Sequence, residues 1–170
     1  LFNQSLTIDP AFSRAYAGIC EANLALYENS NGVDDFTYAE IACEKAQSLN
    51  TDSNSEVNVA LGRLYRLRGL YQKSKDILRE AIAASPSEVN AYVELGEVQA
   101  GNKEFVKAEE TFIRAIELKP NYWKAYESLA DFYYDRAQYA DSANTYEVVS
   151  RLTPDSTIGY LGKGAAYWML

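Results

Sequence analysis

Three of the four prolines in this chain are evenly spaced, and their spacing limits the fold more than any other feature of the sequence. Pro86, Pro120 and Pro154 stand 34 residues apart in a chain of 170 residues. A fixed period of about 20 to 50 residues is typical of proteins that stack copies of one small structural unit. The period therefore predicts a repeat protein in which neighbouring units share a continuous core.

Other positions recur with the same period, and they combine small residues with large ones. They are Leu61-Gly62, Leu95-Gly96 and Leu129-Ala130; Ser74, Ala108 and Ser142; and Leu78, Phe112 and Tyr146. Small residues let two helices approach closely, and large residues three or four places away fill the remaining space. One unit alone is too thin to bury its apolar face, so stacking must supply the missing neighbour. We expect pairs of helices of about 14 residues, each about 21 Å long.

The period also predicts the bounds of the repeats. We expect the end of a preceding repeat at 1–10, whole repeats at 11–51, 52–86, 87–120 and 121–154, and the first helix of a further repeat at 155–170. The repeat at 11–51 is seven residues too long, and the spacing from Cys20 to Ala39 places the extra residues in an interhelix loop near 28–35. Because the chain begins at Leu1 without a methionine and stops at Leu170 in an apolar helical run, we expect it to be part of a larger protein.

Local signals predict where individual helices start and end. The sequence Ser85-Pro86-Ser87-Glu88 has the order of a capping box with proline at the first helical position, so it predicts a helix start at Pro86. Gly69 lies between two predicted helices, where a residue with positive φ is useful.

The composition excludes several classes of function. The chain carries 16 Lys and Arg residues against 24 Asp and Glu residues, for a formal net charge of -8, and it contains no His. This charge opposes binding to nucleic acid, and the missing His removes the commonest acid-base catalyst and metal ligand. No stretch approaches the roughly 18 apolar residues of a membrane-spanning helix, and the sequence has no phosphate-binding loop or nucleophile motif. We therefore expect no enzyme activity, no cofactor, no metal and no nucleic-acid or membrane partner.

The two cysteines, Cys20 and Cys43, are too few for a secreted disulfide framework or a zinc site. Both occupy packing positions of the same repeat, so we expect buried thiols that behave as small hydrophobic side chains. The two positions face a common core, and the sequence leaves open whether a disulfide joins them. The two cysteines therefore do not decide between an oxidising and a reducing compartment, and the cytoplasm is favoured.

The recurring residues resemble the tetratricopeptide repeat family, whose pattern runs from an aromatic residue through Leu-Gly and Tyr to Gly-x-Tyr, Ala, an aromatic residue, Ala and Pro. The second repeat reads ALGRLYRLRGLYQKSK, followed by Ala81 and Pro86, and the fourth reads YESLADFYYDRAQYADS, with Tyr146 and Pro154. The resemblance covers almost the whole chain. It implies an all-α, right-handed superhelix that binds peptides or protein surfaces on a concave face lined by the first helices. The chain also resembles repeat segments of large bacterial signalling proteins that carry separate output domains.

The concave face of that family maps onto a predicted groove in this sequence. It comprises the residues of the first helices that lie opposite the packing positions: Arg14, Glu21, Glu56, Arg63, Arg66, Asn90, Val93, Glu97, Lys124, Glu127, Asp131, Tyr134, Leu161 and Trp168. Those expected to contact a partner are Arg63, Arg66, Asn90, Glu97, Lys124, Glu127, Asp131, Tyr134 and Trp168. Polar residues on a helix face are often merely solvated, so the prediction depends on the set rather than on any one member.

The predicted groove is basic at one end and acidic at the other. Arg63 and Arg66 lie in the second repeat, whereas acidic residues gather in the third and fourth, at Glu94, Glu97, Glu127, Asp131 and Asp135. A ligand along this surface would place acidic groups near the arginines and basic groups near the carboxylates, so we expect a partner with a basic segment. Recognition of chaperone tails, which some family members clamp with Lys, Asn and Arg, is not expected because only Lys124 matches that pattern.

Other functions remain open beside that of a protein-interaction scaffold. The chain could self-associate or act as a spacer in a longer repeat array, or it could sense a signal for an output domain elsewhere in its parent protein. RNA binding through stacked tyrosines is disfavoured, because most of the 14 tyrosines fall in packing positions and the net charge is negative.

Overall fold

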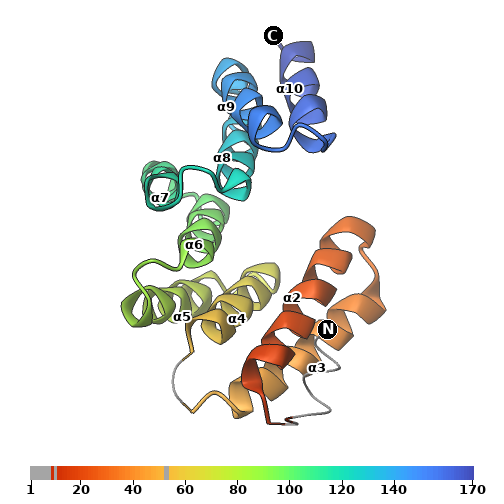
Figure 1. Cartoon of the computed structure of the whole chain (residues 1–170), viewed down its shortest axis with the longest axis vertical. Coiled ribbons are helices and arrows are strands. Elements are labelled where there is room, and N and C mark those ends of the chain that lie inside the picture. The colour runs from red at the N-terminus through yellow and green to blue at the C-terminus, as the bar shows by residue number, and fades with distance from the viewer. Residues whose placement is uncertain (1–8, 10, 52–53) are drawn as a thin grey trace. The chain divides into compact units, whose positions relative to one another are not determined.

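Helices account for all the regular structure in the part of the chain that the computed structural model describes, which comprises residues 9, 11–51 and 54–170 (Figure 1). They are α2 (Ser13–Ser30), α3 (Val33–Ser48), α4 (Ser55–Leu67), α5 (Tyr71–Ala84), α6 (Val89–Gly101), α7 (Phe105–Leu118), α8 (Trp123–Asp135), α9 (Tyr139–Leu152) and α10 (Ile158–Trp168). The all-α fold of helix pairs that the period predicted is confirmed. The repeat end predicted at 1–8, together with Pro10, lies outside the described residues. Among the helices described, we find none with the length and apolar character that crossing a membrane requires.

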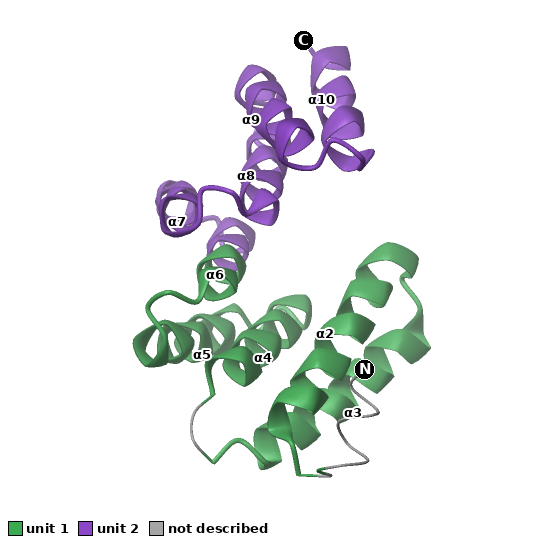
Figure 2. Cartoon of the chain, in the orientation of Figure 1, with its two compact units in different colours: residues 1–95 green, residues 96–170 purple. Residues whose placement is uncertain are grey.

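The chain divides into two compact units, residues 1–95 and 96–170, and the division lies within α6 (Figure 2). In the first unit, α2 packs against α3, α4 packs against α5, and α4 also contacts both helices of the first pair. Its core is built around fully buried Leu24, Leu61 and Leu64. In the second unit, α8 contacts α7 and α9, and α9 packs against α10. The aromatic rings of Phe112 and Phe132 meet in its core, with centroids 5.8 Å apart.

The small and large positions of the repeat meet as predicted. A Cβ atom added to Gly62 would lie 2.5 Å from Cδ2 of Leu78. One added to Gly96 would lie 2.5 Å from Cε1 of Phe112. Both distances are far below van der Waals contact, so a larger residue at either glycine would force its neighbour to move. The absence of a side chain at these positions therefore lets the two helices of each pair approach closely.

The first helix pair is longer than the others, and its extra residues do not form the predicted loop. α2 has 18 residues and α3 has 16, whereas α4 has 13 and α5 has 14, so the helices absorb the whole insertion. Only Asn31 and Gly32 connect them, and Asn31 has a positive φ of 52°. The prediction of a loop at 28–35 was wrong because these two residues complete the turn, which lets the flanking polar residues remain helical.

The recurring prolines lie in turns before the helices rather than at their first residues. α6, α8 and α10 begin three or four residues after the prolines. The carbonyl before each proline, at Ser85, Lys119 and Thr153, accepts a hydrogen bond of 3.0 Å from the N–H three residues later. Proline suits the second position of such a turn because its ring fixes φ. The helix start predicted at Pro86 was therefore wrong, and Ser85 ends α5 instead of capping α6.

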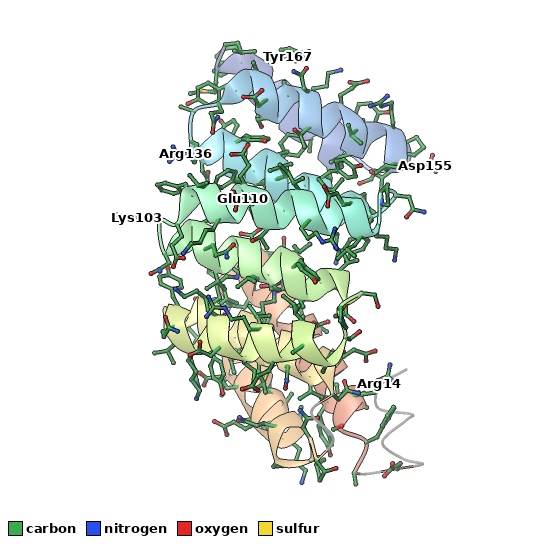
Figure 3. All side chains as sticks on the ribbon, turned by 90° about the vertical axis from the view of Figure 1, so that its left-hand side faces the viewer. Arg14, Lys103, Glu110, Arg136, Asp155 and Tyr167 are labelled. Carbon is green, nitrogen blue, oxygen red and sulfur yellow. A yellow bond between two sulfur atoms is a disulfide. The ribbon has the colours of Figure 1, made fainter. Side chains whose placement is uncertain are left out.

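The turn inside each later helix pair uses a left-handed residue at the same point of the repeat. Gly69 has a φ of 73°, which confirms the prediction made for it. Lys103 and Ala137, each 34 residues further on, have φ values of 62° and 58° (Lys103 is labelled in Figure 3). The geometry of the helix pair therefore imposes this conformation even where no glycine is present.

A disulfide joins the two helices of the first pair. Cys20 on α2 and Cys43 on α3 are both fully buried, and their bonded sulfur atoms link Cα atoms 5.2 Å apart. Their burial is confirmed, but the free thiols that the sequence favoured are not present. The reason is that the two packing positions face each other across the core of one helix pair, which brings the sulfur atoms into contact.

Candidate functional site

The first helices of the first unit line a pocket of about 230 Å³. Its walls come from α2, α4, α6 and the turn before α6, and its lining residues are Arg14, Ala17, Gly18, Glu21, Glu56, Val59, Glu88 and Asn90. Buried Ala17 and Val59 contribute apolar surface, and the remaining side chains are mostly polar or charged. The structure thus brings together Arg14, Glu21, Glu56 and Asn90, which the family resemblance had assigned to one groove.

An ion pair lies on the rim of this pocket. Nε of Arg14 donates a hydrogen bond of 2.7 Å to Oε2 of Glu56, and Nη2 of Arg14 contacts the other oxygen of the same carboxylate. Figure 3 shows Arg14 close to the start of α2. Glu56 lies in the first turn of α4, where the side chain of Asn54 caps the helix by accepting from the Glu56 N–H at 3.0 Å. Because both charged side chains are about half exposed, the pair contributes little stability, and its main effect is to fix two charges beside the pocket.

Arg63 and Arg66 lie on α4 and are bound by carboxylates from two other helices. Glu28, in the last turn of α2, contacts Nη2 of Arg63 and lies 2.9 Å from Nη2 of Arg66. Glu94, on α6, lies 3.1 Å from Nε of Arg66 and 3.7 Å from Nε of Arg63. We call these four residues the arginine network. The sequence predicted a basic surface at this end of the groove, but the two glutamates neutralise it.

In the second unit, α8 presents the acidic part of the predicted groove. Glu127 and Asp131 are four residues apart and therefore lie on the same face of this helix, with Asp135 one turn further on. Restricted hydration and the charge of Asp131 raise the pKa of Glu127, although Lys124 opposes the shift. Restricted hydration and Asp135 also raise the pKa of Asp131, against the effect of the hydrogen bond from the Tyr146 hydroxyl. The raised pKa values mean that the ionised forms of Glu127 and Asp131 are less favoured here than in water.

The remaining predicted site residues differ in exposure. Trp168 and Leu161 on α10 are 89 % and 69 % exposed. Tyr134 is half-buried and packs edge-on against Tyr139, with ring centroids 5.4 Å apart. Val93 is buried. Asn90 and Lys124 are exposed, and Glu97 is half-buried.

Glu28 and Glu88 are charged residues of these surfaces that were not among the residues predicted for the groove. Glu88 lies in the turn before α6, where helical phase gives no information, and one carboxylate oxygen accepts from the Asn90 N–H at 3.3 Å. Glu28 was placed in the predicted loop and so was not tested for a helical face. The signal was present, because Arg14, Glu21 and Glu28 are seven residues apart, which puts them on one face of a continuous helix.

Nothing in the part of the chain that the structure describes brings three or more His, Cys, Asp or Glu side chains into an arrangement that could hold a metal ion.

A family model of the tetratricopeptide repeat matches residues 59–122. Among solved structures, a thermophilic TPR protein from Thermus thermophilus has a TM-score of 0.81 at 17% identity, over 98% of this chain and 87% of that one. YrrB, described as a TPR protein with an unusual peptide-binding site, has a TM-score of 0.54 at 18% identity, over 99% and 82% of the two chains. MamA has a TM-score of 0.58 at 21% identity, over 91% and 85%. At these identities the likeness shows the fold alone. No curated protein sequence matches this chain.

Proposed function

We propose that this chain, in which a tetratricopeptide repeat model matches residues 59–122, is a protein-interaction scaffold whose first helices bind a peptide or protein segment. The pocket of the first unit carries the proposal, because polar side chains from three first helices converge there beside the apolar surface of Ala17 and Val59. A small number of polar groups on a partly apolar pocket is typical of ligand sites. The proposal gives the chain a binding role and no catalytic one.

The partner that we propose has a basic segment, which contacts the acidic face of α8. The raised pKa values of Glu127 and Asp131 support this chemistry, since a lysine or arginine beside them would stabilise their ionised forms. Glu97, in the part of α6 that belongs to the same unit, adds a further carboxylate. Complementary charge would guide the encounter and select against acidic partners. YrrB, a protein of the same fold, is described as having a peptide-binding site.

A capped hexalysine peptide tests the proposal, with fluorescence anisotropy as the measurement. The charge reversals Glu97→Lys and Asp131→Lys together should weaken binding roughly tenfold or more. The control combines Glu110→Lys on α7 with Asp155→Lys in the turn before α10, which makes the same change in net charge at two exposed positions outside the first helices (both labelled in Figure 3). Unchanged affinity in the first variant, or an equal loss in both, would reject a specific basic-segment site.

Exposed apolar side chains on α10 favour self-association as a second function. Leu161, Tyr167 and Trp168 are 69 %, 56 % and 89 % exposed. Neighbouring exposed apolar residues of this size are characteristic of interaction surfaces. A second copy of this chain is the proposed occupant, and sedimentation velocity over a wide range of concentrations tests it. The sedimentation coefficient should rise with concentration in the wild type and stay constant after Leu161→Ser and Trp168→Ser. A wild-type monomer at every concentration would reject this function.

The buried disulfide between Cys20 and Cys43 supports an oxidising compartment over the cytoplasm that the sequence favoured, because structural disulfides are rare in reducing compartments. Trapping of free thiols at the moment of cell lysis tests this proposal. If a thiol reagent modifies both cysteines of the protein from lysed cells, denatured but not reduced beforehand, the proposal is rejected.

A further inference from the structure

The arginine network of the first unit suggests how this protein recognises an acidic group. We propose that Arg63 and Arg66 form a binding site for a carboxylate side chain of a partner, and that Glu28 occupies this site until the partner displaces it. The inference rests on the proposed binding role of the first helices, and it adds the chemistry of one position on their surface.

Glu28 reaches the arginines only because α2 is long. The first helices α4, α6 and α8 each have 13 residues, and a helix of that length starting at Ser13 would end at Ala25. α2 instead continues to Ser30, and its last turn brings the Glu28 carboxylate to both guanidinium groups. The lengthening of this helix therefore supplies an anion from the protein itself at the end of the predicted groove that the sequence marked as basic.

The two glutamates of the network differ in how easily a partner could replace them. The side chain of Glu94 is 13% exposed and comes from within α6, whereas that of Glu28 is 31% exposed and comes from the end of α2. Glu28 is thus the carboxylate that solvent and partners reach. Glu94 holds the two arginines from the other side, so it would keep them in position after Glu28 has left.

The arginines strongly favour an anion at the position of Glu28. Burial alone would raise the pKa of Glu28, but the hydrogen bonds and charges of Arg63 and Arg66 outweigh it and lower that pKa. A guanidinium group binds carboxylates through a planar fork of N–H donors, which gives geometric selectivity as well as attraction. Any carboxylate that takes the place of Glu28 would therefore find the donors already arranged.

Displacement of Glu28 exchanges one carboxylate for another, so the number of ion pairs stays the same. Glu28 nevertheless competes at a high effective concentration, because it is attached to the same chain as the arginines. The apparent affinity for an acidic segment is then lowered by the fraction of molecules in which Glu28 has left the site. Neutralising Glu28 should remove this competition.

Binding of a capped hexaglutamate peptide, measured by fluorescence anisotropy, tests the inference. Glu28→Gln should raise the affinity roughly tenfold. Glu40→Gln is the matched control, because Glu40 also forms an exposed ion pair in the first unit, with Nε of Arg68 at 2.8 Å. The control should leave the affinity nearly unchanged, although it removes the same charge. Capped hexaglutamine should bind neither variant.

A second variant separates recognition by the arginines from a general effect of charge. Adding Arg66→Lys to Glu28→Gln keeps the positive charge but removes the guanidinium fork, so it should cancel most of the gain. Thermal unfolding confirms that each variant is folded. Equal gains for Glu28→Gln and Glu40→Gln, or no gain for either, would overturn the inference. A gain in hexaglutamate binding together with no specific hexalysine binding would instead reject only the basic-segment proposal for α8.

Discussion

Reduction of the disulfide between Cys20 and Cys43 should lower the free energy of unfolding of the first unit by about 3.4 kcal/mol. The two cysteines are 23 residues apart, and a cross-link that closes a loop of this length removes about 11 cal/mol/K of entropy from the unfolded chain. Packing should change little, because both sulfur atoms stay in the buried core between α2 and α3. The predicted loss therefore comes from greater freedom in the unfolded state.

Urea denaturation with and without dithiothreitol, followed by far-UV circular dichroism, measures this difference. With an m-value of about 2 kcal/mol/M, the midpoint of the transition should fall by roughly 1.7 M. The double variant Cys20→Ala with Cys43→Ala is the control, and its curve should be insensitive to dithiothreitol. Thiol titration of the denatured protein checks that the bond is present before reduction. Superimposable curves for the oxidised and reduced protein would refute the reasoning.

Two further predictions concern packing and charge. Gly96→Ala should destabilise the protein by about 1–3 kcal/mol because the added Cβ would lie 2.5 Å from the Phe112 ring, whereas Gly164→Ala, with no atom within 4 Å, should stabilise it by up to about 1 kcal/mol. Equal changes in unfolding free energy would contradict this account. Glu127→Gln should stabilise the protein by roughly 0.5 kcal/mol near neutral pH, because the ionised Glu127 carboxylate is poorly hydrated and is repelled by Asp131 across one helical turn. The folded-state pKa of Glu127 is raised, so wild-type stability increases as the pH falls through it, and the advantage of the variant in thermal unfolding should vanish below about pH 4. An advantage that persists at acidic pH would exclude repulsion as the cause.

The helix pairs and their packing positions could be predicted because they depend on spacing along the chain. A small residue at Gly62 or Gly96 and a large one 16 positions later face each other in any helix pair with a short turn, whatever surrounds it. The positive φ at Gly69 follows from the same local geometry. These features need only the regular geometry of the helix and the excluded volume of side chains, so the sequence by itself determined them.

The contacts of the candidate site cannot be predicted from the spacing of residues along the chain. Glu28, Arg63 and Glu94 come from three helices, and their network forms only because a two-residue turn lets α2 continue to Ser30. The disulfide likewise requires two positions 23 residues apart to face each other across one core. Only the tertiary structure decided which charges are neutralised within the protein and which face solvent, because ion pairing depends on distances between helices. The order of residues along each helix does not specify those distances.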